Sequence, residues 1–360
     1  MAGFANAAPP EVWMAHYYPQ KLTTERLEWD FTRRNLDGME LYINAVAYLI
    51  PQPELAAFAT DCKAAGIKIG IEGGYFDWEP QSLDFDQPNP RGITERVRPN
   101  LEPGVGARCA GEEMAKLANL ISAYGPPDYM VLDGPVRRLM HPGADTGRMT
   151  PDGDIKGLWL ISKVGDELVG YMRAWREKYP QVQFVLITNF PNWGWKGEMA
   201  YWGSGPGGMF WGDYYPLIRS VLRRLEAEGL KPAGVRADSP YEHTKGEYNI
   251  YGTPWPEPIK DPASVDWMSR LLDLERFVKS QDVEFDIVLN SDLGGNTSAQ
   301  AFSERSLEFL DWYRASGGQA DRYIVQSWYK YPEKDGPEDE PYTLTHLTAE
   351  FLHRLKPQVD

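Results

Sequence analysis

Two aspartates are the residues of this sequence best placed to do chemistry, because each ends a short apolar segment. Asp133 follows Tyr129–Leu132, four uncharged residues that predict a strand buried on both faces. Asp238 ends the apolar part of GVRADSP in the same way, two residues after Arg236. Ligands of α/β proteins bind at the carboxyl ends of such strands. The other interpretation of Asp133 is a turn cap, since aspartate often precedes glycine in turns.

Acids, amides and aromatic rings close the other predicted strands, and lysine is nearly absent from these positions. Carboxylates transfer protons or attack as nucleophiles, amides bind hydroxyl groups, and tryptophan offers a flat face to a sugar ring. A phosphate site would need cations and amide-rich turns instead. We therefore expect a carbohydrate site. Its candidate binding residues are His16, Tyr17, Glu72, Asp77, Trp78, Asn189, Trp193, Arg236, Glu242, Asn290, Asp292 and Trp328.

The candidate residues are expected to take different roles. Trp78, Trp193 and Trp328 are the expected stacking platforms, and Glu72, Asn189 and Asn290 the expected hydroxyl contacts. Two-residue alternation points Arg236 and Asp238 the same way, so the arginine either orients an acid or forms a structural Arg–Asp bridge. His16 either binds substrate or is a packed rim histidine.

Two facing carboxyl groups are what glycoside hydrolysis requires: about 5 Å apart for retention and about 6.5 to 9.5 Å apart for inversion of configuration. Strand ends across a barrel mouth can meet both spacings. We expect a glycoside hydrolase acting on an oligo- or polysaccharide, retaining, with Asp133 as nucleophile and Asp238 as acid/base. The alternatives are an inverting enzyme that uses Glu72 or Asp292 with Asp238, and a barrel that binds glycans without catalysis.

These positions depend on an alternation of strands and helices along the whole chain of 360 residues. Such alternation indicates βαβ units and a parallel sheet. The eight expected strands lie near Val12, Leu41, Ile69, Val131, Leu186, Val235, Val288 and Ile324. The expected helices are Thr23–Asn35, Pro53–Ala65, Gly111–Tyr124, Lys163–Tyr179, Tyr215–Glu228, Val265–Ser280, Ala299–Ser316 and Leu344–Leu355.

Eight strand–helix pairs without a linker predict a single (β/α)8 TIM barrel domain over residues 1–360. A doubly wound open sheet is the alternative, but no strand precedes a GxGxxG or Walker motif. The segments after the strands are long, at 76–108, 136–160, 189–212 and 239–262. They carry many of the 13 Trp, 20 Tyr and 13 Phe residues. Enlarged loops at one barrel face are expected to build the site.

Composition excludes several classes of partner. The formal net charge of -15 argues against a nucleic-acid or anionic-membrane surface, which needs clustered Lys and Arg. No apolar run reaches the roughly 18 residues of a membrane span. The five histidines are scattered without HxH or HExxH spacing, so neither a metal nor another cofactor is expected. The predicted partner is a carbohydrate, and the sequence does not indicate an oligomeric state.

Two features of the sequence bear on cellular location and on the redox state of the cysteines. Cys62 and Cys109 could form one disulfide or remain as two thiols, since their spacing matches no metal or redox motif. The start, MAGFANAAPPEVW, has no charged region followed by an apolar stretch, as an intact signal peptide would. An Ala-rich start fits the remnant of signal removal, which favours a secreted or periplasmic protein over a cytoplasmic one.

The segment LANLISAYGPPDYMVLDGP, residues 117–135, resembles retaining alpha-L-fucosidases, in which a helix, a Tyr-Gly-Pro turn and a strand lead to the nucleophilic aspartate. The preceding CKAAGIKIGIEGGYFDWEP resembles strand three of that family. The resemblance implies Asp133 as nucleophile. It does not imply fucose specificity, because LYINAVAY lacks the family's His-His-Asp-Gly-Phe stretch.

The pairing of Asp133 with an Arg-x-Asp on strand six is similar to the alpha-galactosidase clan, where the second aspartate is the acid/base. That clan usually has a lysine two residues before the nucleophile, and Val131 stands there in this chain. The two resemblances together imply a distant member of the (β/α)8 α-glycoside hydrolases.

Overall fold

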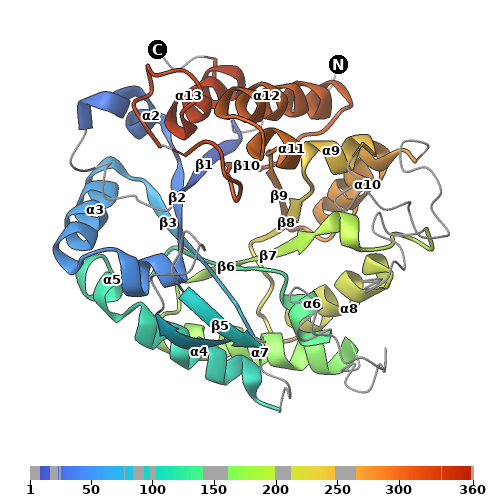
Figure 1. Ribbon diagram of the computed structural model, residues 1–360. Coiled ribbons are helices and arrows are strands. Elements are labelled where there is room, and N and C mark those ends of the chain that lie inside the picture. The colour runs from blue at the N-terminus through green and yellow to red at the C-terminus, as the bar shows by residue number, and fades with distance from the viewer. Residues whose placement is uncertain are drawn as a thin grey trace, which may run out of the picture.

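Eight parallel strands form a closed barrel in the computed structural model, surrounded by helices (Figure 1). The structure describes residues 9–16, 23, 26–76, 78–83, 93–97, 103–140, 161–198, 212–247, 265–333 and 335–357. The barrel strands are β1 (Glu11–His16), β2 (Gly38–Tyr42), β3 (Lys68–Gly73), β6 (Tyr129–Leu132), β7 (Gln183–Asn189), β8 (Gly234–Asp238), β9 (Glu284–Val288) and β10 (Arg322–Val325). Their order around the barrel is β1-β10-β9-β8-β7-β6-β3-β2, which confirms the predicted (β/α)8 fold.

Helices connect the strands and cover the outside of the barrel (Figure 1). The longer ones are α3 (Gln52–Ala65), α4 (Val105–Lys116), α7 (Ile161–Lys178), α8 (Tyr214–Ala227), α10 (Trp267–Ser280), α12 (Ala299–Ala315) and α13 (Leu344–Leu355). The shorter ones are η1 (Arg26–Trp29), α2 (Asp30–Asn35), the π-helix η2 (Ala45–Leu49), α5 (Ala118–Ala123), α6 (Pro135–Met140), η4 (Phe190–Asn192), α9 (Tyr241–Lys245) and α11 (Asp292–Gly295).

Most predicted helices agree with the observed ones to within two residues at each end. The helix predicted over Gly111–Tyr124 differs, because it begins at Val105 and breaks at Leu117 into α4 and α5. Side-chain caps fix several helix starts, as where Ser298 accepts a hydrogen bond from the Ala301 amide at the start of α12.

The long segments after the strands contain elements that the sequence patterns did not indicate. After β3 the chain forms an antiparallel hairpin of β4 (Trp78–Leu83) and β5 (Ile93–Val97). Helices α6, α9 and α11 follow β6, β8 and β9 directly. The strand ends at this face therefore lead into short ordered elements.

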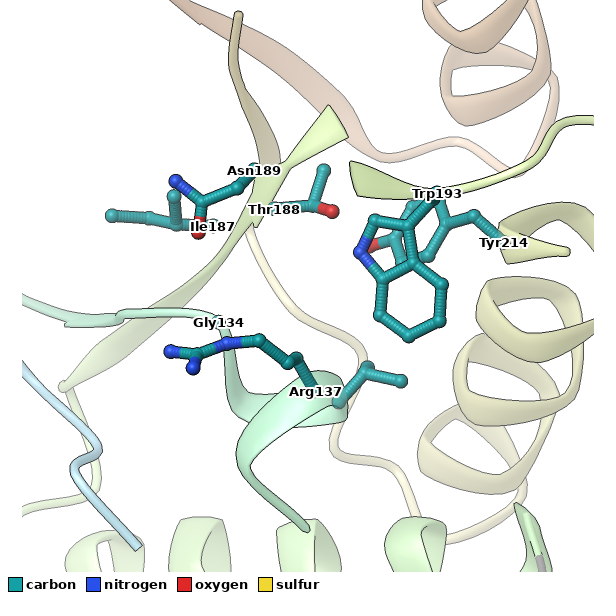
Figure 2. Close-up of a pocket in the computed structure, with 8 residues that line it drawn as sticks. Gly134, Arg137, Ile187, Thr188, Asn189, Trp193 and Tyr214 are labelled. Carbon is teal, nitrogen blue, oxygen red and sulfur yellow. The ribbon is translucent and has the colours of Figure 1, made fainter. Parts of the chain in front are cut away.

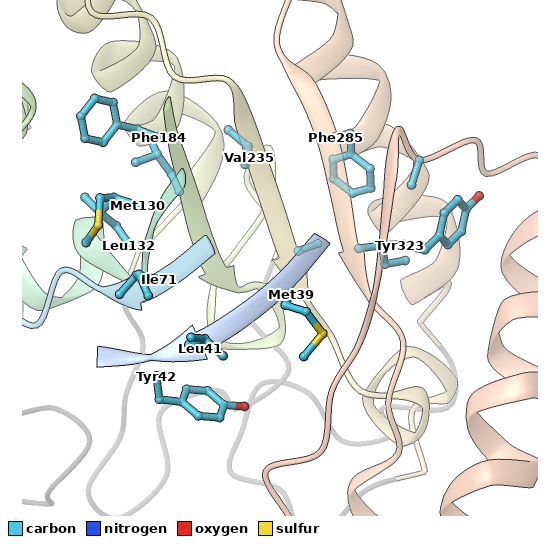
Figure 3. Packing of buried hydrophobic residues seen from close by; sticks show 14 of the residues in the cluster. Met39, Leu41, Tyr42, Ile71, Met130, Leu132, Phe184, Val235, Phe285 and Tyr323 are labelled. Atoms are coloured by element: carbon cyan, nitrogen blue, oxygen red, sulfur yellow. The ribbon is translucent and has the colours of Figure 1, made fainter. Parts of the chain in front are cut away.

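Apolar side chains form two layers of core. The outer layer lies between the strands and the helices and includes Leu132, Phe184 and Val235 (Figure 3). Inside the barrel, alternate residues build smaller clusters, one of them around Trp13. A Cβ at Gly38 would lie 2.3 Å from the Trp13 ring, so glycine is required where this indole crosses the barrel interior.

Charged groups share the barrel interior with these apolar clusters. Arg236, 1% exposed, forms ion pairs with Glu40 at 2.6 Å and Asp286 at 3.4 Å. Nearer the amino-terminal ends of the strands, Arg322 donates to both oxygens of Asp286 and to Glu11. Hydrogen bonds from Lys68 and Arg322 and the charge of Arg322 outweigh partial burial and lower the pKa of Glu11 to about 2. The barrel interior thus contains a network of buried ion pairs next to the apolar clusters.

Two general features complete the fold. Cys62 and Cys109 are both buried, and no disulfide joins them. Within the ranges that the structure describes, no helix is long and apolar enough to cross a membrane.

Candidate functional site

A cavity of about 320 Å³ opens at the carboxyl ends of the barrel strands. That volume lies at the lower end of the roughly 300–1,000 Å³ typical of small-molecule sites. Its walls combine acids, amides, a guanidinium, aromatic rings and aliphatic side chains. The lining residues are Glu72, Asp133, Arg137, Ile187, Asn189, Asp238, Val288, Gln326, Trp328 and Tyr329. The structure therefore brings together five of the predicted site residues, namely Glu72, Asp133, Asn189, Asp238 and Trp328.

Asp133 is held at the end of β6 by the barrel and by the helix that follows. Its backbone N–H donates to the Gly73 carbonyl at 2.9 Å. Its carboxylate Oδ2 forms an ion pair of 2.5 Å with Arg138, whose Nε also donates to the Asp133 carbonyl at 2.8 Å. Gly134 takes a φ of 54°, a conformation that glycine adopts easily, and this turn starts α6. A buried guanidinium at this distance stabilises Asp133 as an anion.

Asp238 has a different electrostatic environment. Burial raises its pKa to about 7, and the charges of Asp133 and Asp292 add to the rise. The positive charge of Arg236 and a hydrogen bond from Asn189 oppose it. A carboxyl group with a pKa near 7 exchanges its proton readily at neutral pH, which is the property required of a general acid that later acts as a base.

Glu72 closes the cavity on the β3 side. Its side chain is 1% exposed and accepts hydrogen bonds from the Tyr75 hydroxyl at 3.1 Å and from Gln326 Nε2 at 3.2 Å. Gln326 Nε2 also donates to the Tyr42 hydroxyl, and the Tyr42 ring lies 4.6 Å from that of Trp328. Carboxylate, amide and indole thus form one connected wall.

Trp193 does not lie on this wall. Its ring is 2% exposed and packs against Tyr214, with centroids 5.2 Å apart. Figure 2 shows it beside a second, enclosed pocket that has no room for a water molecule. Such a ring has no face left for a sugar, which corrects the expectation of a stacking platform.

Glu242 is also buried rather than presented to the cavity. Its carboxylate accepts hydrogen bonds from the Ser291 hydroxyl, the Asp292 amide at 2.9 Å and Arg305 at 2.8 Å. These contacts fix the turn between β9 and α11. The expectation of a substrate contact is corrected, because Ser291, Asp292 and Arg305 already occupy this buried carboxylate.

Arg236 lies two residues before the carboxyl end of β8 and so one layer of side chains deeper in the barrel than Asp238. It points into the barrel, as does Asp238, but its ion pairs are with Glu40 and Asp286. Of its two sequence interpretations, the structural bridge describes its contacts, although the bridging acids are not Asp238. Its influence on the site is electrostatic, since its charge lowers the pKa of Asp238.

Asn290 and Asp292 follow β9, and neither is among the residues that line the cavity. Asn290 is fully buried, and neither polar atom of its side chain has a hydrogen-bond partner among the described residues. Asp292 accepts a hydrogen bond from Asn296 at 2.7 Å. Both remain predicted substrate-binding residues. Tyr17 and Asp77 lie outside the described residues, as do the side chains of His16 in β1 and Trp78 in β4.

Several lining residues were not found from the sequence. They are Arg137, Gln326 and Tyr329, and Arg138 contacts Asp133 beside them. The sequence patterns predict a loop from residue 136 and, at the end of β10, only Trp328 as a site residue. The signal for the two arginines was present, since proline at 135 is a favourable first residue of a helix. A helix there places both arginines within reach of Asp133.

Metal ligation has no support in the part of the chain that the structure describes. No group of three or more His, Cys, Asp or Glu side chains able to hold a metal ion occurs there. His243 is buried, and burial lowers the pKa of its imidazole to about 3.

The sequence matches no known protein family and no curated protein. Solved structures are similar in fold. A GH10 endoxylanase retrieved from a sugarcane soil metagenome has a TM-score of 0.51 at 8% identity, covering 96% of this chain and 97% of that one. A GH5_18 protein from Streptomyces cattleya, in complex with GlcNAc, has a TM-score of 0.47 at 13% identity, covering 98% and 82%. The Ignisphaera aggregans GH53 catalytic domain has a TM-score of 0.43 at 14% identity, covering 84% and 77%.

These identities show the fold alone. The chain has the (β/α)8 barrel of which the GH10 endoxylanase is an example, and the predicted distant resemblance to (β/α)8 glycoside hydrolases is confirmed at that level.

Proposed function

We propose that this protein is a retaining glycoside hydrolase in which Asp133 is the nucleophile and Asp238 the acid/base. The observation that carries the proposal is the contrast between two acids of one cavity. Asp133 is paired with Arg138 at 2.5 Å, whereas burial and neighbouring acids raise the pKa of Asp238 to about 7. Retaining hydrolysis needs this division, one carboxyl group anionic and the other able to give and take a proton.

The reaction follows from these two states. Asp133 attacks the anomeric carbon while the glycosidic bond breaks, and Asp238 gives its proton to the departing oxygen. The glycosyl ester on Asp133 is then hydrolysed. Asp238 removes a proton from the attacking water, the water oxygen bonds to the anomeric carbon, and Asp133 is released as a carboxylate. Each step uses groups that line the cavity.

The proposed substrate is an oligo- or polysaccharide. Trp328 and Tyr329 offer aromatic faces at the cavity, and Glu72 and Gln326 offer acceptor oxygens for hydroxyl groups. In this proposal Trp328 stacks on a sugar ring while Glu72 accepts hydrogen bonds from hydroxyl groups at the cavity floor. One aromatic side and one polar side suit the two faces of a pyranose.

The test is a screen of labelled polysaccharides followed by substitution of the two acids. Asp133→Asn and Asp238→Asn should each lower kcat by several orders of magnitude with little change in folding. Asp311→Asn, in an exposed position on α12, is the matched control and should leave kcat unchanged. Near-normal turnover by either cavity variant would remove that residue from its proposed role. Glycan binding without any hydrolysis would instead indicate a non-catalytic barrel.

An inverting reaction is the second candidate, since Glu72 lines the same cavity as Asp238. It would use one of these two acids as general acid and the other as base for water. The configuration of the first-formed product, followed by proton NMR, separates the candidates. Retention supports the pair Asp133 and Asp238, and inversion supports Glu72 with Asp238.

A further inference from the structure

We propose that Asn189 is a positioning residue, which orients the carboxyl group of Asp238 and stabilises its carboxylate form through one hydrogen bond. Sequence patterns suggested a hydroxyl-binding role for Asn189 instead. The catalytic consequence rests on the proposed function, whereas the contact itself does not.

The barrel register brings the two residues together. Asn189 and Asp238 are the last residues of β7 and β8 and are paired positions in this parallel ladder, as Ile187 and Arg236 are one layer below. Figure 2 shows the side chains of Asn189 and Ile187 on one side of β7 and that of Thr188 on the other. Paired residues of neighbouring strands point the same way, so Asn189 and Asp238 share the cavity wall.

Within the described ranges, one hydrogen bond reaches this carboxyl group. Asn189 Nδ2 donates to Asp238 Oδ2 at 2.9 Å. Asp238 Oδ1 is shielded and has no hydrogen-bond partner among the described residues. A short carboxyl side chain with a single donor depends on that donor for its orientation. Without Asn189, neither oxygen would have a donor from the residues that the structure describes.

The surrounding charges make this one bond important. Asp133 from the end of β6, Asp292 from α11 and Glu72 from β3 are the acids around Asp238. Burial is the largest cause of its raised pKa, and the charges of Asp133 and Asp292 follow.

Two basic groups face the same acid. Arg236 lies below it and lowers its pKa, but this arginine is shared with two buried acids. Arg137 lines the cavity from α6. In the part of the chain that the structure describes, Asn189 therefore donates the one hydrogen bond that favours the anion.

Asn189→Leu, similar in size but without a donor, is the test. Loss of a hydrogen bond to a charged group should raise the pKa of Asp238 by about one unit. The pKa is read by carbon NMR of protein labelled at the aspartate carboxyl carbons, with Asp238 assigned from the Asp238→Asn spectrum. Asn189→Asp, which adds a like charge, should raise it further. Thr188→Val, on the opposite side of β7, is the control and should leave it unchanged.

Activity gives a second readout. In Asn189→Leu, the alkaline limb of the pH profile of kcat/KM should shift to higher pH, together with the pKa of Asp238 measured by NMR. An Asp238 pKa that stays constant or falls in the folded variant overturns the inference, as does a uniform loss of activity with no movement of the limb. If Asn189→Leu does not fold, Asn189→Ala, which is smaller and also lacks a donor, carries the same test.

Failure of this inference can be told from failure of the proposed function. A pKa that rises as expected in a protein that hydrolyses no glycan leaves the contact established and contradicts the catalytic role of Asp238. Hydrolysis that depends on Asp238, combined with an unmoved pKa in Asn189→Leu, contradicts the positioning role alone.

Discussion

Arg236→Met tests whether this arginine holds the barrel together or contacts a substrate. The guanidinium is 1% exposed and is, among the described residues, the one ion-pair partner of Glu40, which is fully buried. Asp286 would keep its two hydrogen bonds from Arg322. The substitution therefore leaves one acid, Glu40, buried without compensation.

Breaking a buried pair from one side costs about 3–5 kcal/mol. That is a large part of the roughly 5–15 kcal/mol by which folded domains are stable. For a chain of 360 residues it corresponds to a fall in Tm of about 5 °C. Urea unfolding followed by circular dichroism measures the free energy, and a thermal scan measures Tm.

Two further variants identify the cause. Glu40→Gln combined with Arg236→Met removes the uncompensated charge and should recover much of the lost stability. Arg223→Met, on the exposed side of α8, is the matched control and should change stability by less than about 0.5 kcal/mol. A loss below about 1 kcal/mol in Arg236→Met, together with a raised KM in a folded protein, would refute the structural role.

Three other predictions follow from the cavity. Asp238 has a folded-state pKa of about 7, above its unfolded value, so its effect on stability is most favourable below about pH 4 and is lost as the pH rises through 7. Asp238→Asn should therefore stabilise the protein at pH 8 by an amount on the order of a few kcal/mol, and urea titrations in which this gain persisted at pH 4 would contradict the assignment. In the unsubstituted enzyme, kcat/KM should fall about tenfold per pH unit above about pH 7 as Asp238 loses its proton, and a flat profile to pH 9 would exclude it as the acid. Trp328→Ala should raise KM by about tenfold with a smaller change in kcat, because aromatic stacking contributes about 0.5–1.5 kcal/mol beyond the buried apolar area. Initial rates measure both constants, and an unchanged KM would place the sugar elsewhere.

The strand positions could be predicted from the sequence because a buried parallel strand is a short run of mostly apolar residues. Tyr129–Leu132 and the other runs are short, rich in apolar residues and bounded by turns, and all eight are barrel strands. Once the barrel is known, Asp133 and Asp238 must lie on one rim. Two-residue alternation also gave the shared direction of Arg236 and Asp238, although not the arginine's partners.

The chemistry of the rim was less readable, since it depends on side chains distant in the sequence. No sequence feature near Glu242 predicts that its carboxylate accepts a hydrogen bond from Ser291 or forms an ion pair with Arg305. Burial of Trp193 against Tyr214 likewise depends on how the chain after β7 folds back. A polar or aromatic residue at a strand end can face the cavity or serve as framework, and only three-dimensional contacts decide which.

Trapping the covalent intermediate tests the central proposal most directly. A 2-fluoro glycosyl substrate, chosen from the sugar that the screen identifies, slows breakdown of the glycosyl-enzyme so that peptide mass spectrometry can locate the bound sugar. The proposal predicts one sugar per chain, attached to Asp133 and absent in Asp133→Asn. A sugar attached to Glu72, or hydrolysis with inversion and no trapped sugar, would contradict it.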